Sequence, residues 1–206
     1  MKHRASRELY GYWNRVRGHA QAPRRSDIEP AGISGILADT FILESAARDR
    51  LPIRLAGTRI CSLYGREIRS GDFLALWSKT DREAITTLAT AVAVDAAAAV
   101  LSMEAVTRSG RRLPCEALLL PLIQSGPDFD RILGSCAPLE KPFWLGSDPI
   151  VAQNLVGFRL IWPDEHPAFM QPSKNAKEVD GVTPAAIPPS TFKRRAHLTI
   201  FEGGKR

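Results

Sequence analysis

The segment RLAGTRICSLYGREI, residues 54–68, decides how the middle of the chain folds. It starts as a strand, because apolar and polar side chains alternate into Gly57, which ends the strand and allows a turn. Thr58 can act as the N-cap of a short helix over residues 60–64. Gly65 permits a left-handed exit from that helix. The segment therefore predicts a direct passage from a strand into a helix.

The residues before this segment predict a β-hairpin. Residues 40–44 (TFILE) are rich in β-formers, and residues 52–56 alternate with Ile53 and Leu55 on one face. The spacer at 45–51 is short and polar. Two strands with such a spacer are expected to pair in antiparallel fashion.

The residues after it predict a long helix and a series of strands. Thr80–Glu83 reads TDRE, a capping-box pattern. The apolar stripe that follows consists of Ile85, Leu88, Ala89, Val92 and Ala96. Three runs of strand-forming residues come next, and a fourth run could add a further strand; they are residues 100–108, 113–123, 131–139 and 155–162.

This order of elements resembles the PAS fold. That fold is α+β, a five-stranded antiparallel sheet with helices on one face, here with an N-terminal helix and a flexible C-terminal tail in addition. Residues 41–43 and 54–68 look like a bacterial family of stand-alone PAS-like proteins, the fifth PAS group. Its members begin with a helix containing Tyr-Trp, here residues 12–15 (YWNR), and often end in a tail like residues 195–204. The resemblance covers roughly residues 8–163 and the tail.

Charge and composition divide the chain into three parts. Residues 1–26 form a basic N-terminal helix and connector with net charge +6, from seven Lys/Arg and one Asp/Glu. Residues 27–163 form the PAS-like domain. Residues 164–206 form a proline-rich linker and a basic, apolar tail, whose last part, 190–206, carries +4. The basic ends could contact nucleic acid, acidic partners or anionic lipid, or could serve only as solubilising tails.

Catalytic and metal-binding motifs are missing from the sequence. Cys61, Cys115 and Cys136 form no Cys-x-x-Cys pair, and the four histidines form no short-spaced pair. Ser190–Lys193 fits a Ser-x-x-Lys pattern, but it lacks the partner motifs of penicillin-recognising enzymes. We therefore expect no enzyme, no metal and no cofactor that a motif requires. The odd cysteine count and the lack of a signal peptide or an apolar span favour a cytoplasmic protein.

A ligand pocket between the sheet and the helices is possible in a PAS-like fold. Two arginines, Arg54 and Arg59, could pair with an anionic ligand there. The same apolar side chains could instead be plain core. The apolar candidates are Phe41, Leu43, Cys61, Tyr64, Trp77 and Met103.

The helix over residues 6–17 has an apolar side made by Leu9, Trp13 and Val16. A helix of this length is marginal alone in water, so its apolar side must be covered. We expect a homodimer through these residues. If the chain is a monomer, the helix must lie on its own sheet.

The C-terminal run around Leu198, Ile200 and Phe201 is β-prone and follows a basic cluster. An apolar run at a chain end is a liability unless it is covered. We expect it to dock as an added strand on a partner, on a second copy or on its own domain. The alternative is that it forms the last strand of the domain itself.

Together these features predict a non-catalytic regulatory module that acts through protein–protein contacts. The resemblance implies bacterial signal transduction, with kinases or cyclic-dinucleotide enzymes as partners and with modulation by a ligand left open. One alternative is a small-molecule binding protein. A weaker alternative is a nucleic-acid binder acting through the basic ends, since the sequence contains no helix-turn-helix or zinc finger.

Overall fold

The computed structural model describes residues 1–44, 50–124 and 130–162. All of these residues belong to one compact unit, Met1–Glu165. The proposed docking residues Leu198, Ile200 and Phe201, and the tail as a whole, lie outside the described residues. Within the described residues, no helix is long and apolar enough to cross a membrane.

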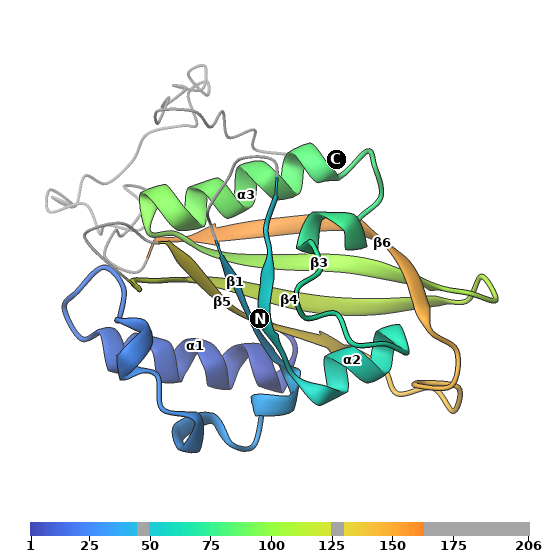
Figure 1. Cartoon of the computed structure of the whole chain (residues 1–206), viewed down its shortest axis with the longest axis horizontal. Coiled ribbons are helices and arrows are strands. Elements are labelled where there is room, and N and C mark those ends of the chain that lie inside the picture. Colours follow the sequence, from blue (N-terminus) through green and yellow to red (C-terminus); the bar gives the residue numbers. More distant parts are fainter. Residues whose placement is uncertain (45–49, 125–129, 163–206) are drawn as a thin grey trace, which may run out of the picture. The chain divides into compact units, whose positions relative to one another are not determined.

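A six-stranded antiparallel sheet forms the centre of the fold (Figure 1). Its order is β2-β1-β5-β4-β3-β6. The strands are β1 (Thr40–Glu44), β2 (Ile53–Ala56), β3 (Ala98–Thr107), β4 (Arg112–Leu122), β5 (Arg131–Pro138) and β6 (Ile150–Ile161). The predicted antiparallel PAS-like sheet is confirmed. The optional strand at 155–162 is present as β6, which begins at Ile150 and makes six strands in place of five.

Three α-helices and four short 3-10 helices complete the described fold. The α-helices are α1 (Arg4–Arg17), α2 (Thr58–Tyr64) and α3 (Arg82–Asp95). The 3-10 helices are η1 (Arg25–Asp27), η2 (Pro30–Ile33), η3 (Leu37–Asp39) and η4 (Phe73–Leu76).

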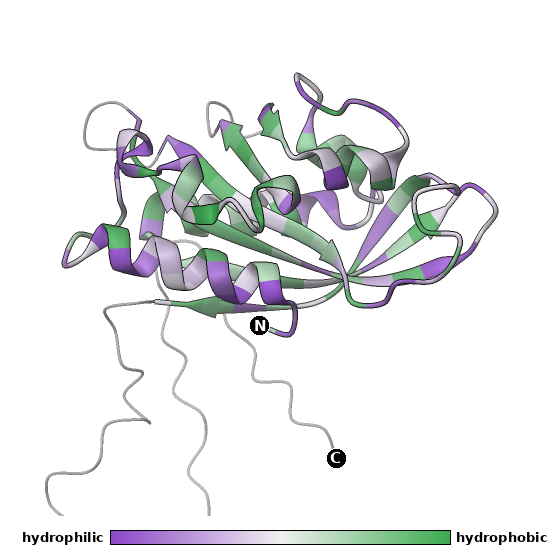
Figure 2. Cartoon of the chain, turned by 90° about the horizontal axis from the view of Figure 1, so that it is seen from below, coloured by the Kyte–Doolittle hydropathy of each residue, from purple (hydrophilic) through white to green (hydrophobic). Residues whose placement is uncertain are grey.

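Hydrophobic side chains pack on both faces of the sheet. Along β4, Ala117 and Leu119 contribute to the core shared with α2 and α3, whereas Leu118 and Leu120 contribute to the core shared with α1. Successive side chains of a strand point to opposite faces, so α1 covers one face and α2 and α3 the other. Figure 2 shows hydrophobic residues (green) along most of the strands and hydrophilic ones (purple) largely on loops and outer helix turns.

The hairpin β1–β2 forms as predicted, but its facing residues differ from the expectation. Leu43 pairs with Ile53, whereas Ile42 pairs with Leu55, because the register shifts between Ile42 and Leu43. Ile53 is therefore buried with the α2–α3 core, while Leu55 is 38% exposed. A bulge of one residue breaks the alternation that placed both side chains on one face.

The structure confirms the predicted C-cap of α2 but not the predicted N-cap. Gly65 is left-handed (φ 61°, ψ 20°) and ends the helix. The N-cap, however, is Gly57, and Thr58 is the first helical residue, so the expected side-chain cap is wrong. Gly57 has ordinary φ (−69°), but a Cβ there would overlap the carbonyl oxygen of Ala38. Close backbone approach, and not the turn, requires glycine at this position.

The apolar stripe of α3 is confirmed, since Ile85, Leu88, Ala89 and Val92 are buried. Its predicted capping box is not formed. The N-cap is Asp81, whose carboxylate makes no cap hydrogen bond. Its Oδ2 instead accepts hydrogen bonds from the Ser78 hydroxyl (2.7 Å) and from the backbone N–H of Leu155 on β6 (2.9 Å). The start of α3 is thus tied to the edge of the sheet.

Candidate functional site

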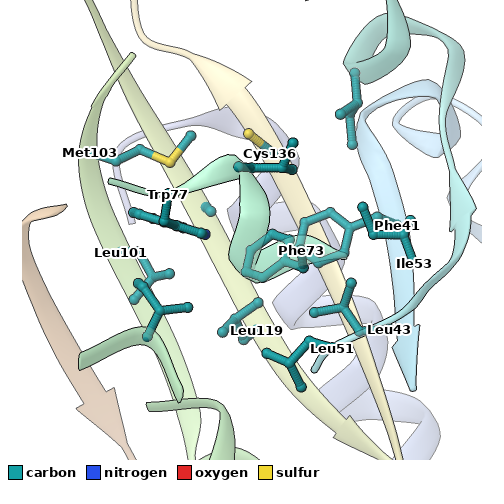
Figure 3. Close-up of a cluster of buried hydrophobic side chains, with 14 of the residues drawn as sticks. Phe41, Leu43, Leu51, Ile53, Phe73, Trp77, Leu101, Met103, Leu119 and Cys136 are labelled. Carbon is teal, nitrogen blue, oxygen red and sulfur yellow. The ribbon is translucent and has the colours of Figure 1, made fainter. Parts of the chain in front are cut away.

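Buried hydrophobic side chains, among them three aromatic rings, fill the interior between the sheet and the helices α2 and α3 (Figure 3). The rings of Phe41 on β1 and Phe73 on η4 stack at 5.4 Å between centroids. The Trp77 ring meets Phe73 edge-on at 5.9 Å. Gly134 on β5, directly opposite Phe41, makes room for this arrangement, because a Cβ there would overlap the Phe41 ring.

The space left in this interior is a cavity of about 10 Å³. Of the predicted pocket residues, Phe41, Tyr64 and Met103 line it. Leu43 and Trp77 lie in the same core, and Cys61 lies at its margin. Small-molecule pockets measure about 300–1,000 Å³, whereas one water needs about 10–15 Å³. In this structure the predicted pocket residues therefore act mainly as core.

The side chains of Tyr64, Gln153 and Trp77 bring polar groups into this core. The Tyr64 hydroxyl donates a hydrogen bond of 2.6 Å to Oε1 of Gln153 on β6. Burial raises the pKa of Tyr64 well above its ordinary value, so the hydroxyl stays a donor. The indole Nε1 of Trp77 is buried and has no hydrogen-bond partner among the described residues.

The two arginines predicted to bind an anion in the interior lie outside it. Arg54 forms an ion pair with Glu44, and its side chain is 60% exposed. Arg59 is held by Asp39 through Nε (2.7 Å) and Nη2 (2.6 Å), and its side chain is 57% exposed. Both assignments to an interior pocket are thus wrong, because each arginine reaches a carboxylate of the same chain at the surface.

The thiols are unactivated. Burial raises the pKa of Cys115 to about 12 and raises that of Cys136 as well. The pKa of Cys61 is also raised, chiefly by burial, and its Sγ lies 3.4 Å from Glu67 Oε1. A protonated thiol is a poor nucleophile and a poor metal ligand. The described residues contain no group of three or more His, Cys, Asp or Glu that could hold a metal ion.

The residues expected to form a dimer lie largely inside the chain's own core. Leu9 and Trp13 are fully buried, and Val16 packs partly buried against the same cluster. The Trp13 indole N–H donates to the carbonyl oxygen of Pro121 on β4 at 2.9 Å. The dimer was predicted because the apolar side of this helix needs a cover. The structure shows that one face of the chain's own sheet already covers that side.

Exposed apolar residues gather on β6 instead, which the sequence did not reveal. Val151, Val156 and Phe158 are 57%, 70% and 54% exposed. β6 is also an edge strand. The Ser78–Asp81 segment forms two hydrogen bonds with the outer side of β6. The backbone N–H of Ser78 donates to the carbonyl oxygen of Gln153, and the backbone N–H of Leu155 donates to Oδ2 of Asp81. Beyond Leu155, no described segment outside the sheet is hydrogen-bonded to its backbone.

A groove of about 530 Å³ lies away from the interior. It runs between the start of α1, the η2–η3 segment, α2 and the residues after β5. The lining residues used below are His3, Ile36, Asp39, Arg59, Leu63 and Lys141. Reasoning from the sequence found only Arg59 among these, since the others come together through the fold.

Comparison with known proteins gives one family match. The family model PAS_5, described as PAS domain, matches residues 1–137, from α1 to the end of β5. No curated protein matches the chain.

Solved structures of similar shape include two of the blue-light photoreceptor Aureochrome1 LOV. The light-state structure is 14% identical with a TM-score of 0.42, and the match covers 55% of this chain and 90% of that one. The dark structure is 14% identical with a TM-score of 0.42, covering 53% and 80%. A light-oxygen-voltage domain studied with a flavin analogue is 13% identical with a TM-score of 0.40, covering 50% and 77%.

Proposed function

Because the chain belongs to the PAS domain family, a family of sensory modules in signalling, we propose that it is a non-catalytic regulator that acts by contacting other proteins. Its setting in this proposal is bacterial signal transduction in the cytoplasm. The partners are signalling proteins such as kinases or cyclic-dinucleotide enzymes, together with a second copy of the chain.

The observation that carries the proposal is the apolar edge of the sheet on β6. Val156 and Phe158 are more than half exposed, and they lie where the outer backbone of the edge strand is unpaired among the described residues. An edge strand of this kind offers hydrogen bonds to an added strand and apolar contacts to its side chains. We call Val156, Phe158 and the outer backbone from Val156 to Ile161 the β6 surface.

The local geometry explains why these side chains are exposed. Phe158 pairs with Leu101 of β3, which is fully buried, but β6 is the last strand at this edge of the sheet among the described residues. Val156 has no partner on β3, because Gly157 pairs with Ser102 and Leu155 with Met103. The bulge turns Val156 outward. An apolar protein segment would cover both residues.

The non-catalytic part of the proposal is supported by the chemistry of the interior. Burial raises the pKa values of its thiols, and the Tyr64 hydroxyl is bonded to Gln153. The rings of Phe41, Phe73 and Trp77 pack in the interior between the sheet and the helices. This packing supports the proposal that the module acts through contacts at its surface.

Affinity purification from the native cell tests the proposal. The wild-type chain is compared with Phe158→Lys and with the control Val94→Lys, which changes an apolar residue on α3 that is 60% exposed. We expect a signalling protein to co-purify with the wild type and with Val94→Lys, and to be lost with Phe158→Lys. Equal recovery with all three chains would refute the β6 surface as the contact site.

A further inference from the structure

The groove of about 530 Å³ differs from the interior cavity in size and in charge. Its volume lies within the range of about 300–1,000 Å³ typical of small-molecule sites. It contains residues of both cores, since Ile36 belongs to the core beneath α1 and Leu63 to the core beneath α2 and α3. The groove thus lies where the elements of the two faces of the sheet meet.

The floor of the groove is apolar. Ile36 is 4% exposed, Leu63 is 7% exposed and Ala137 is 2% exposed. Pro138 and Leu145 continue this apolar lining. Such a floor accepts a hydrocarbon or aromatic body, because contact removes apolar surface of both partners from water.

The charged residues of the groove are mainly cationic. Its lining contains Arg4, Arg59 and Lys141 against a single acid, Asp39, which gives a net charge of +2. Both oxygens of Asp39 are already bonded by Arg59. Arg4 is paired with Glu8 at 2.6 Å outside the lining, so Arg59 and Lys141 are the cations that matter most.

Arg59, Lys141 and His3 keep hydrogen-bond donors that have no partner among the described residues. Arg59 bonds Asp39 through Nε and Nη2, and the described residues give Nη1 no partner. Lys141 is exposed and forms no ion pair with a described residue. The His3 ring accepts a hydrogen bond from the backbone N–H of Ala5 at Nδ1 (3.1 Å), so the neutral ring carries its proton on Nε2.

The start of α1 is fixed beside this groove by a buried acid. Glu116 on β4 is 2% exposed and accepts the backbone N–H groups of Lys2 (2.7 Å) and His3 (3.0 Å). The His3 ring is therefore held at the groove by hydrogen bonds on both its backbone and its Nδ1. A donor that is positioned in advance loses little entropy when it binds a ligand.

We propose that this groove binds an organic anion with an apolar body. The body lies on Ile36, Leu63 and Ala137, and the anionic group is held by Arg59, Lys141 and the His3 Nε2–H. The ligand class follows from cations at the rim and an apolar floor. This site is separate from the β6 surface, and the proposal does not depend on the proposed function.

A fluorescence titration of the full chain tests the proposal with two probes of the same aromatic body. The anionic probe is anilinonaphthalene sulfonate, and the uncharged one is phenylnaphthylamine. We expect the sulfonate to bind about ten-fold more tightly, as for one charge-assisted contact. Lys141→Gln and Arg59→Gln should each remove most of this preference.

The matched control is Arg54→Gln, because Arg54 is another exposed arginine paired with an acid, but it lies outside the groove. It should leave the affinity for both probes unchanged. Lys141→Gln removes an exposed side chain without breaking an ion pair, so it reports on the site even if Arg59→Gln unfolds the chain. Amide shifts in an NMR titration should centre on Gly35, Ser62 and Gly146, which line the groove.

Three results would overturn the proposal. They are equal affinity for the two probes, an unchanged preference in Lys141→Gln, and shifts that centre elsewhere in the chain. Inorganic phosphate, which has no apolar body, should produce much smaller shifts at these three residues than the sulfonate does. Equal shifts would contradict the role of the apolar floor.

Discussion

The hydroxyl of Tyr64, at the end of α2, donates a buried hydrogen bond of 2.6 Å to Oε1 of Gln153 on β6. The bond joins the segment that identifies the fold to the strand that carries the exposed apolar surface. Gln153 is 1% exposed and Tyr64 is 6% exposed, so neither group can replace its partner with bulk water. A buried polar group without a partner costs about 1–3 kcal/mol.

Tyr64→Phe should therefore lower the free energy of unfolding by about 1–3 kcal/mol, because Oε1 of Gln153 loses its donor. The measurement is urea unfolding of the wild type, Tyr64→Phe, Gln153→Leu and the double variant. The two single effects should be non-additive by more than about 0.5 kcal/mol. Strict additivity would show that the bond contributes nothing.

Gly57→Ala should destabilise the chain by about 1–3 kcal/mol, because the new Cβ would overlap the carbonyl oxygen of Ala38. The control is Gly11→Ala in the middle of α1, where a Cβ meets no atom within 4 Å. This change should stabilise the chain by about 0.5–1 kcal/mol through the helix propensity of alanine. Thermal and urea unfolding check both values. Equal effects of the same sign would contradict the structure at Gly57.

Glu116→Gln should lower the free energy of unfolding by about 1.5–3 kcal/mol at pH 7, because the carboxylate accepts hydrogen bonds from two backbone N–H groups. Burial alone would raise the pKa of Glu116, but the hydrogen bonds from the backbone N–H groups of Lys2 and His3 lower it below its ordinary value. A lowered pKa means that this stabilisation is present above the pKa of an unfolded-state glutamate and is lost as the pH falls through the folded-state value.

The measurement is urea unfolding of wild type and Glu116→Gln at neutral and at acid pH. The difference between the two proteins should shrink as the pH falls. Glu104→Gln is the control, because Glu104 pairs with Arg112 at the surface and should change stability by at most about 1 kcal/mol. A difference that stays constant with pH would contradict the role of the Glu116 charge.

Local patterns predicted much of this fold. The passage from β2 through Gly57 into α2 depends on neighbouring residues, and so does the apolar stripe of α3. Such features are set by propensity and period within one segment. The strands β3, β4 and β5 follow for the same reason, and their predicted bounds differ by a few residues from the observed ones.

The remaining features depend on contacts between distant residues. The pairing of Arg59 with Asp39 joins residues from α2 and η3. The filling of the interior by Phe73 and Trp77 comes from a segment without a clear period. The position of α1 depends on which face of the sheet is free. An amphipathic pattern indicates that the apolar side of a helix must be covered, but it does not indicate which surface covers it.

The dimer predicted from the sequence remains a prediction, but Leu9 and Trp13 of α1 are buried in the chain's own core, so we propose the β6 surface as the contact instead. We expect the wild-type chain to sediment as a dimer, with the β6 surfaces of two copies pairing at their edges. Phe158→Lys should shift it to a monomer, because two lysines would meet at the contact, while Val94→Lys should stay dimeric. A wild-type monomer at high concentration, or a dimer in Phe158→Lys, would contradict this arrangement.

The most direct measurement of the central claim is photo-crosslinking in the native cell, with a photoreactive amino acid at position 158 or at position 94. Both positions are exposed and apolar, so they differ only in where they lie on the fold. The account predicts a crosslink from position 158 to a signalling protein or a second copy, and none from position 94. Crosslinks of equal yield at both positions, or none at position 158, would contradict it.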